Sequence, residues 1–196
     1  MKVFSLSTLT LFLALTVSLN AQTYTVNPKT SSLQWHGKKV TGEHFGFISL
    51  KEGTMTMSKD QITGGKFVID MNSITNTDVK DAGYNTKLVN HLKSDDFFGA
   101  ATYPVAVLEL VKSTPFKNNE ATVEGKLTIK NITHPVTFTA KRAGSIYSAM
   151  IVVDRSKYDV RYGSGSFFEG LGDNMIYDDF DLTVSISVMD SSQANR

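Results

Sequence analysis

The sequence of 196 residues contains no cysteine and carries almost no net charge. The absence of cysteine excludes disulfide bonds, thiolate zinc sites, cysteine nucleophiles and a lipid-modified N-terminal cysteine. Because 20 Lys and Arg residues balance 19 Asp and Glu residues, the chain lacks the basic surface that would attract nucleic acid or an anionic membrane. With 41% hydrophobic and 10% aromatic residues, the composition is that of a folded protein, and the length suggests a single domain.

Sequence motifs of common enzymes and metal sites are also missing. There is no G-x-S-x-G nucleophile elbow and no H-E-x-x-H zinc motif. Residues 163–168 begin like a dinucleotide-binding loop, but Phe168 stands at the third glycine position, which favours a structural loop. His36 and His44 could meet on neighbouring strands, yet His36 alternates with Trp35 and is expected to face solvent. We therefore predict no cofactor, no metal site and no catalytic residue.

Residues 1–21 have the pattern of a secretory signal peptide. Lys2 precedes an apolar run from Val3 to Leu19, and Ala21 provides the small residue at which cleavage is expected. The run contains several serines and threonines and falls short of the roughly 20 apolar residues that span a bilayer. We expect a periplasmic or secreted protein without stable membrane insertion. A retained membrane anchor is the alternative.

Alternation of polar and apolar residues dominates residues 22–190, and a polar tail follows at 191–196. The alternation predicts strands at 32–39, 44–51, 54–58, 65–71, 105–112, 122–130, 136–141, 145–154 and 179–188. Asn131 suits a tight turn between two of these strands, because asparagine tolerates a left-handed backbone. Many long strands with one apolar face predict an all-β protein, either a closed antiparallel barrel or a sandwich.

One stretch has helical spacing instead. Residues 81–94 place Leu88 and Leu92 on one face, and Asp78 or Asp81 could cap the start of the helix. Phe97 and Phe98 follow as an apolar corner. The chain is therefore expected to form strands with one helical connection.

Aromatic and aliphatic residues are spread over most of the predicted strands. Two interpretations fit this content. The interior can be a packed core, or it can enclose an apolar cavity, because an eight-stranded barrel is just wide enough either to be filled by side chains or to hold one ligand. Alternation alone does not separate the two.

Several short motifs follow one another at characteristic spacing. They are LQWHGK at 33–38, GEHFG at 42–46, GGKFVIDMNSI at 64–74, HLKSDDFF at 91–98, YP at 103–104, VEGKLTIK at 123–130, THPVT at 133–137 and DRSKY at 154–158. Their order resembles that of the YceI-like family, the lipid- and polyisoprenoid-binding barrels that many bacteria secrete. Asn131 stands where the family usually has glycine, a change that the turn tolerates.

The resemblance implies a lipocalin-like antiparallel eight-stranded barrel over residues 22–190, with an apolar cavity for a polyisoprenoid or another long-chain amphiphilic lipid. Such proteins are binders or carriers rather than enzymes. The residues expected to line the cavity, its packed ends or its mouth are Leu33, Trp35, Phe45, Phe47, Phe67, Ile69, Leu88, His91, Leu92, Phe97, Phe98, Leu127, Ile129, Phe138 and Phe180. A shift of one residue in any strand would exchange its two faces.

The sequence also allows other roles for His91 and for the protein as a whole. His91 could meet a polar head group, although a helix-capping or simply hydrogen-bonded histidine is favoured, and Arg155 could hold the glycine-rich loop. One alternative is an enzyme for a hydrophobic substrate, with His91, Asp95 or Asp96 as acid or base. The other is a non-catalytic envelope interaction module with a filled core. The identity of the lipid and the oligomeric state, with a homodimer as one option, are not predicted.

Overall fold

The computed structural model describes residues 21–190. The expected signal peptide, apart from Ala21, and the expected tail at 191–196 lie outside the described residues. The strands of the described part are β1 (Gln22–Val26), β2 (Ser32–Lys39), β3 (Gly42–Ser58), β4 (Gln61–Asp70), β5 (Val105–Ser113), β6 (Glu120–Ile129), β7 (Ile132–Ala143), β8 (Ile146–Asp154) and β9 (Ile176–Asp190).

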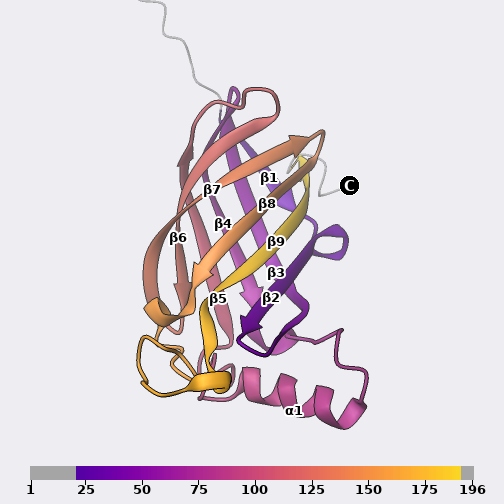
Figure 1. Ribbon diagram of the computed structural model, residues 1–196. Coiled ribbons are helices and arrows are strands. Elements are labelled where there is room, and N and C mark those ends of the chain that lie inside the picture. The colour runs from indigo at the N-terminus through magenta and orange to yellow at the C-terminus, as the bar shows by residue number, and fades with distance from the viewer. Residues whose placement is uncertain (1–20, 191–196) are drawn as a thin grey trace, which may run out of the picture.

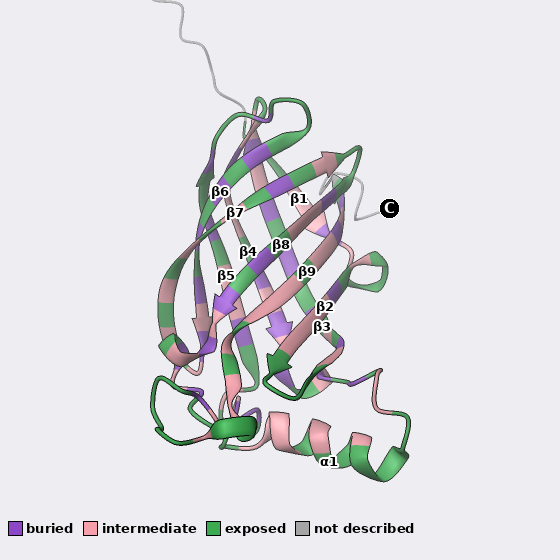
Figure 2. Ribbon diagram, viewed as in Figure 1, coloured by how far each residue is buried: buried purple, intermediate pink, exposed green. Residues whose placement is uncertain are grey.

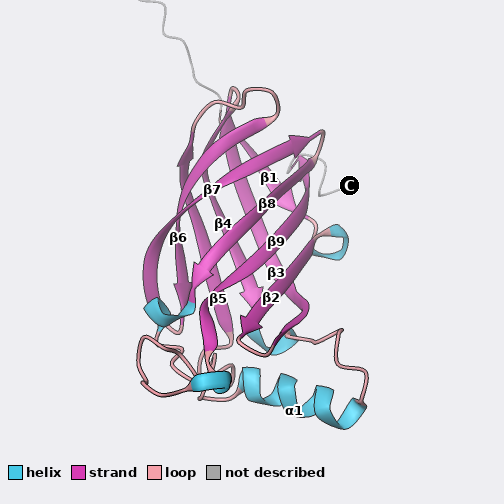
Figure 3. Ribbon diagram, in the orientation of Figure 1, coloured by secondary structure: helices cyan, strands magenta, loops and turns pink. Residues whose placement is uncertain are grey.

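The strands form an eight-position antiparallel barrel (Figures 1 and 3). From β2 to β9 each strand pairs with the next one in sequence, and β9 returns to pair with β2. β1 does not add a ninth position. It pairs with β3 and β9 beyond the end of β2, so β1 and β2 share one position that a 3₁₀ turn, η1 (Pro28–Thr30), interrupts. The predicted lipocalin-like, eight-stranded, all-β fold is confirmed.

Alternation explains the core. On β6 the side chains of Ala121, Val123, Leu127 and Ile129 are buried, while most of their neighbours along the strand are exposed (Figure 2). Successive residues of a strand point to opposite faces, so this pattern turns one face of the sheet inward. Burying a valine or leucine side chain contributes roughly 1.5–3 kcal/mol, and the barrel repeats this gain around its circumference.

Several predicted strand boundaries differ from the structure, most clearly in β3. The strands expected at 44–51 and 54–58 are one continuous strand, β3, whose register against β4 shifts between Leu50 and Glu52. A bulge bends a strand without ending it, and the sequence pattern reads the bend as a break. The β6–β7 turn consists of Lys130 and Asn131, both with positive φ, as a two-residue hairpin of this type requires.

One end of the barrel carries the helical elements. The turn η2 (Met71–Ser73) leads through an extended segment to α1 (Ala82–Lys93), and Asp81 caps α1 by accepting a hydrogen bond from the Tyr84 N–H. The short turns η3 (Arg155–Tyr158) and η4 (Gly172–Asn174) belong to the connection between β8 and β9. α1 lies across this end, and none of its residues is buried (Figures 1 and 2). Within residues 21–190, no helix is long and apolar enough to cross a bilayer.

Candidate functional site

The barrel interior contains two apolar hollows in line. A cavity of about 170 Å³ lies next to α1 and is here named the near chamber. A second cavity of about 80 Å³ lies deeper in the barrel and is named the far chamber. Four aliphatic residues line both chambers and form the waist between them: Ile69, Leu127, Val153 and Leu182. The two chambers therefore follow one axis and are separated only by side chains.

Helix α1 and the corner after it cover the near chamber. Leu88 and Leu92 of α1 line the chamber, together with Phe97 and Phe98. The ring of Phe98 meets the ring of Phe180 edge to face, with centroids 6.2 Å apart. Edge-to-face aromatic pairs of this kind contribute about 0.5–1.5 kcal/mol beyond the burial of their area. The corner is therefore fixed to the inner face of β9.

The side wall of the near chamber depends on a glycine. Residues 74–78, here named the wall segment, run beside β3, where the N–H groups of Thr75 and Thr77 donate to the backbone oxygens of Phe47 and Phe45. Trp35 Nε1 donates to the Thr75 oxygen at 2.9 Å. The cross-strand partner of Trp35 is Gly46, and a Cβ at Gly46 would lie 2.0 Å from the Thr75 oxygen. Only glycine allows this approach.

A histidine–carboxylate pair holds the same wall at the rim of the chamber. His44 lines the chamber, and its Nδ1 lies 2.7 Å from Asp78 Oδ2. Asp78 Oδ1 accepts hydrogen bonds from the Phe45 N–H, at 2.9 Å, and from the Asn76 side chain. Burial works against ionisation of Asp78, but these hydrogen bonds outweigh it and lower its pKa below the usual value. Asp78 is therefore an anion at neutral pH.

Asparagines connect the wall segment to α1. Asn85 Nδ2 donates to the backbone oxygens of Asn76 and Val79, each at 3.0 Å. The Val79 N–H in turn donates to Asn76 Oδ1 at 3.0 Å. Asn76 is buried, so its amide needs these partners. The network ties the start of α1 to the barrel wall by polar contacts.

A buried arginine organises the opposite side of the chamber. Arg155 is 3% exposed, and its guanidinium donates to the backbone oxygens of Val160, Tyr162, Ile176 and Tyr177. Burial lowers the pKa of Arg155, and the charge of Asp178, 3.4 Å away, opposes that shift. The guanidinium also lies 5.7 Å from the centre of the Phe97 ring. Arg155 thus holds the loop before β9, the role that the sequence suggested.

His91 lies outside both chambers. Its ring packs edge-on against the rings of Phe97 and Tyr162, at centroid distances of 5.0 and 4.5 Å, and its Nε2 lies 3.5 Å from Asp96. His36 and His44 point to opposite faces of the barrel wall, and His36 instead lies 3.0 Å from Glu43. In the described part of the chain, no three potential ligands of a metal ion gather. The chemistry that the chambers offer is apolar contact.

Comparison with known proteins now identifies the family. A model of the YceI-like domain matches residues 24–188. The chain belongs to the YceI-like family. Curated relatives include UPF0312 proteins of Vibrio campbellii and Vibrio parahaemolyticus, which are 27% and 26% identical over 139 residues. Each match covers 70% of this chain and 71% of the relative.

Solved structures show the same YceI-like fold. BcnA of Burkholderia cenocepacia aligns with a TM-score of 0.62 at 22% identity, over 84% of this chain and 99% of BcnA. A domain of Saccharophagus degradans, described as polyisoprenoid-binding and implicated in plant cell wall breakdown, aligns with a TM-score of 0.56 at 15% identity, over 85% and 98% of the two chains. The YceI protein of Campylobacter jejuni gives 0.55 at 16% identity, over 97% and 100%. At these identities the likeness concerns the fold.

Most residues that the sequence singled out line this YceI-like interior. The far chamber contains Leu33, Phe67 and Phe138; the near chamber contains Trp35, Leu88, Leu92, Phe97, Phe98, Ile129 and Phe180; and the waist contains Ile69 and Leu127. Three predicted residues lie elsewhere: Phe45, Phe47 and His91. Their contact with a bound ligand, and that of the lining residues, stays a prediction.

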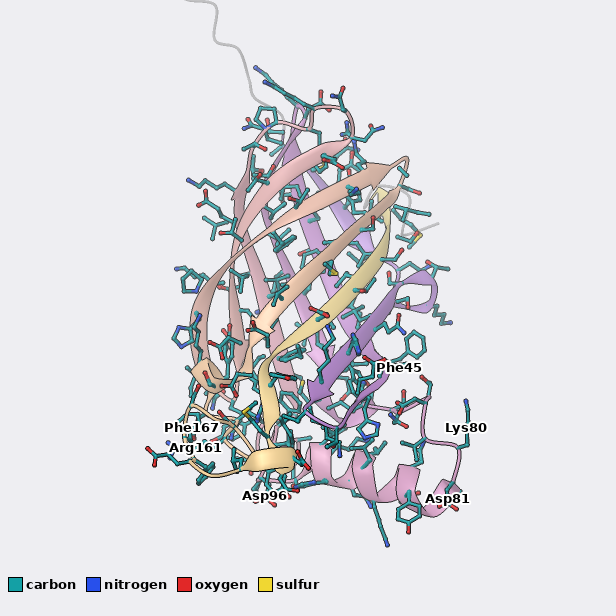
Figure 4. The ribbon with its side chains drawn as sticks, viewed as in Figure 1. Phe45, Lys80, Asp81, Asp96, Arg161 and Phe167 are labelled. Atoms are coloured by element: carbon teal, nitrogen blue, oxygen red, sulfur yellow. The ribbon has the colours of Figure 1, made fainter. Side chains whose placement is uncertain are left out.

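The placement of Phe45 and Phe47 corrects the sequence analysis. Both belong to the outer face of β3, and Phe47 is 43% exposed. Phe45 packs against His36 on the outside of the wall, near the end that carries α1 (Figure 4). Their neighbours His44 and Ile48 line the near chamber instead. Residues 44–48 of β3 do alternate between the two faces of the wall. The inward position opposite the Trp35 indole has to be a small residue, Gly46, so its neighbours Phe45 and Phe47 face outward.

The sequence analysis missed part of the lining. On the strands the missed residues include Leu50, Met55, Ile62, Ala106, Leu108, Leu110, Val123, Val136, Ala140, Tyr147, Ile151, Val153, Leu182, Val184 and Ile186. Alternation could have found most of these, because Leu182, Val184 and Ile186 continue the pattern of Phe180. Outside the strands, Ile74 and Arg155 gave no periodic signal and became lining residues through the path of the connections, whereas Met71 continues the alternation of Phe67 and Ile69.

Proposed function

We propose that this YceI-like protein is an extracytoplasmic carrier that binds the hydrocarbon chain of a polyisoprenoid, or of another long-chain amphiphilic lipid, inside the barrel without catalysis. One observation carries the proposal: two apolar chambers lie on one axis, separated by four aliphatic side chains. A linear chain can extend through both. The polyisoprenoid-binding domain of Saccharophagus degradans, which shares the fold, supports the same ligand class. The signal-like N-terminus supports the location.

The chemistry of the lining suits such a ligand. Hydrocarbon removed from water contributes roughly 25 cal/mol per Å² and needs no hydrogen-bonding partner. The polar head group stays at the rim of the near chamber, where Lys38, Lys39 and His44 offer polar contacts. The ammonium group of Lys38 is 3.3 Å from the Asp181 carboxylate. A head group that binds Lys38 would therefore compete with Asp181 for this ammonium group.

The chamber sizes add a requirement. Ligand pockets usually enclose about 300–1,000 Å³. The chambers of 170 and 80 Å³ are smaller, so a long chain must widen the interior by turning the side chains of the waist. Ile69 and Leu127 come from different strands, β4 and β6, and their side chains can rotate without breaking a ladder.

Native mass spectrometry tests the proposal. The full chain is expressed in a bacterium, purified from the envelope fraction without detergent, and measured before and after extraction with organic solvent. We expect a bound mass that matches a long-chain lipid and disappears on extraction. Recovery of the protein from the cytoplasm alone would contradict the extracytoplasmic part.

Two other results would favour the alternatives. If only the ligand-free mass appears, and added polyprenol does not raise the melting temperature, the interior acts as a filled core. That result would favour the alternative of a non-catalytic interaction module. If a bound lipid is converted during incubation, the protein is an enzyme. Bound ligand at 100 times its Kd should stabilise the fold by about 2.7 kcal/mol, which a melting experiment detects easily.

A further inference from the structure

The ladder between β7 and β8 ends early. It spans four residue pairs, from Ala143 and Ile146 at the hairpin to Ala140 and Ala149. Below that point β7 stays paired with β6, and β8 stays paired with β9 down to Asp154. Residues 132–139 and 150–154 therefore face each other without a ladder, and this gap is here named the seam. Figure 1 shows β7 curving away from β8 toward the end that carries α1.

The far chamber reaches the seam. Val136 and Phe138 line it from β7, and Ile151 lines it from β8. Ser148 also lines the chamber, although it sits between the inward-facing residues Tyr147 and Ala149 and belongs to the outer face of β8. The far chamber therefore lies against both strands that border the seam.

Burial agrees with an opening at this place. Within the seam, the inward residues of β7 at 132, 134, 136 and 138 are only partly buried, whereas Val123, the β6 partner of Phe138, is fully buried. On the outer side Met150 and Val152 are 63% and 54% exposed. Apolar side chains of β8 thus lie both at the chamber and on the outer surface beside the seam. At its lower end the seam is closed by the buried Tyr158 ring, which packs edge-on against His134 at 5.3 Å.

Pro135 removes one hydrogen-bond donor from the edge of β7 that faces the seam. Counting from the two-residue β6–β7 turn, Ile129 and Ile132 form a hydrogen-bonded pair, and pairs alternate from there. Pro135 and Lys126 then form a non-hydrogen-bonded pair, so the proline nitrogen faces the seam. A continued β7–β8 ladder would need an N–H at this position, which proline lacks. The same missing donor discourages a strand of another protein from adding to this edge.

We propose that the seam is a lateral portal through which the hydrocarbon chain of the ligand enters and leaves the far chamber. The proposal rests on the binding function proposed above and adds the route. A chain that enters sideways does not have to thread past α1 and the waist. A portal differs from a binding surface in one measurable respect: closing it slows entry and exit by the same factor and leaves the equilibrium affinity unchanged.

A chemical staple across the seam tests the route. The described chain has no cysteine, so Thr137→Cys combined with Val152→Cys gives two unique thiols on opposite sides of the seam, both on exposed residues. The two thiols are linked with the shortest bismaleimide that joins them. Intact mass measurement shows whether the link has formed. The matched control is Glu109→Cys with Lys126→Cys, two exposed partners within the complete β5–β6 ladder. The probe is cis-parinaric acid, a fluorescent polyene fatty acid, followed by stopped flow.

We expect the seam staple to slow association and dissociation of the probe about tenfold each, with the same Kd, while the control staple changes neither rate by more than about twofold. Unchanged rates in the seam-stapled protein would overturn the portal and leave the binding function intact. A changed Kd would also overturn it, because the staple would then cover a binding surface. If the unstapled protein does not bind the probe at any concentration, the binding function fails, and the portal fails with it.

Discussion

At the scale of single residues, the wall of the near chamber depends on groups that leave no hydrophobic pattern. Gly46 admits the Thr75 carbonyl and the Trp35 indole, and Asp78 collects three hydrogen-bonding partners. Neither residue contributes apolar area. Both allow the wall segment, residues 74–78, to lie against β3, and the near chamber needs this segment as its side wall.

Gly46→Ala should detach the wall segment. The added methyl group would lie 2.0 Å from the Thr75 oxygen, and such overpacking typically costs about 1–3 kcal/mol. Trp35 is the only tryptophan, so its fluorescence reports both the loss of the Thr75 hydrogen bond and the midpoint of urea unfolding. Gly64→Ala on β4, where an added Cβ meets nothing within 4 Å, serves as the control. Equal stability of the two variants would show that the approach is not tight.

Asp78→Asn should make part of the stability independent of pH. The folded state lowers the pKa of Asp78, so the native fold binds its proton more weakly than the unfolded chain does. The resulting stabilisation is complete above the unfolded pKa of about 3.9 and is lost as the pH falls through the lower folded value. Unfolding in urea should show the variant about 1–2 kcal/mol less stable at pH 7, with a difference that shrinks toward pH 2. A constant difference over that range would mean that the charge plays no part.

The sequence could predict which residues are apolar and alternate, but not which face of each strand is inside. Phe67, Ile69, Leu127 and Phe180 were assigned correctly to the interior because their strands have one apolar and one polar face. On β3 both faces carry apolar residues. Which face points inward depends on the size of the cross-strand partner, because the large Trp35 side chain leaves room only for Gly46 opposite it. Such a choice appears only when the partner strand and its register are known.

At the scale of elements, α1 is a cover that is attached at two ends rather than packed into the core. Asn85 ties its start to the wall segment, and His91 packs against Tyr162 near its end. Of the residues of α1, only Leu88 and Leu92 line the chamber. The predicted helix at 81–94 is confirmed, and of the two predicted cap candidates, Asp78 and Asp81, Asp81 is the cap. That the helix covers a cavity follows from tertiary contacts that spacing does not encode.

Asn85→Ala should loosen this cover selectively. The substitution removes the amide that donates to Asn76 and Val79, so amide hydrogen exchange in α1 should accelerate at least about tenfold while exchange in β6 stays unchanged. Asn90→Ala, at an exposed position on the same helix, is the control for helix propensity. Equal exchange in the two variants would mean that the leucine contacts alone hold α1.

At the scale of the whole molecule, the waist determines how much of the interior one ligand can use. Alternation predicted a closed barrel or a sandwich, and the resemblance carried by the order of the motifs implied the barrel. The two chambers could not be predicted from the sequence. A filled interior and a hollow one differ only slightly in total side-chain volume, and that volume comes from strands that are distant in sequence. The waist residues look, in the sequence, like any other buried aliphatic residues.

Leu127→Trp should block the waist. The larger side chain should leave the near chamber open to short chains and deny long chains the far chamber, so the gain in affinity with chain length should stop early. Titration with fatty alcohols of increasing length measures this, and Val111→Trp on an exposed outer position is the control. The melting temperature of both variants should be measured first, because overpacking costs about 1–3 kcal/mol. Full affinity of the Leu127 variant for the longest chain would place the ligand elsewhere.

The pairing of β9 with β1 and β2 also sets the order in which the interior comes into being. All other ladders of the ring join strands that are neighbours or near neighbours in the sequence, whereas Leu33 pairs with Val184 and Tyr24 pairs with Asp190. Until β9 has paired, the first eight strands form an open curved sheet whose apolar face has no partner. Exposed apolar sheet of this kind is prone to aggregate. The period of greatest aggregation risk during folding therefore ends only when β9 closes the ring.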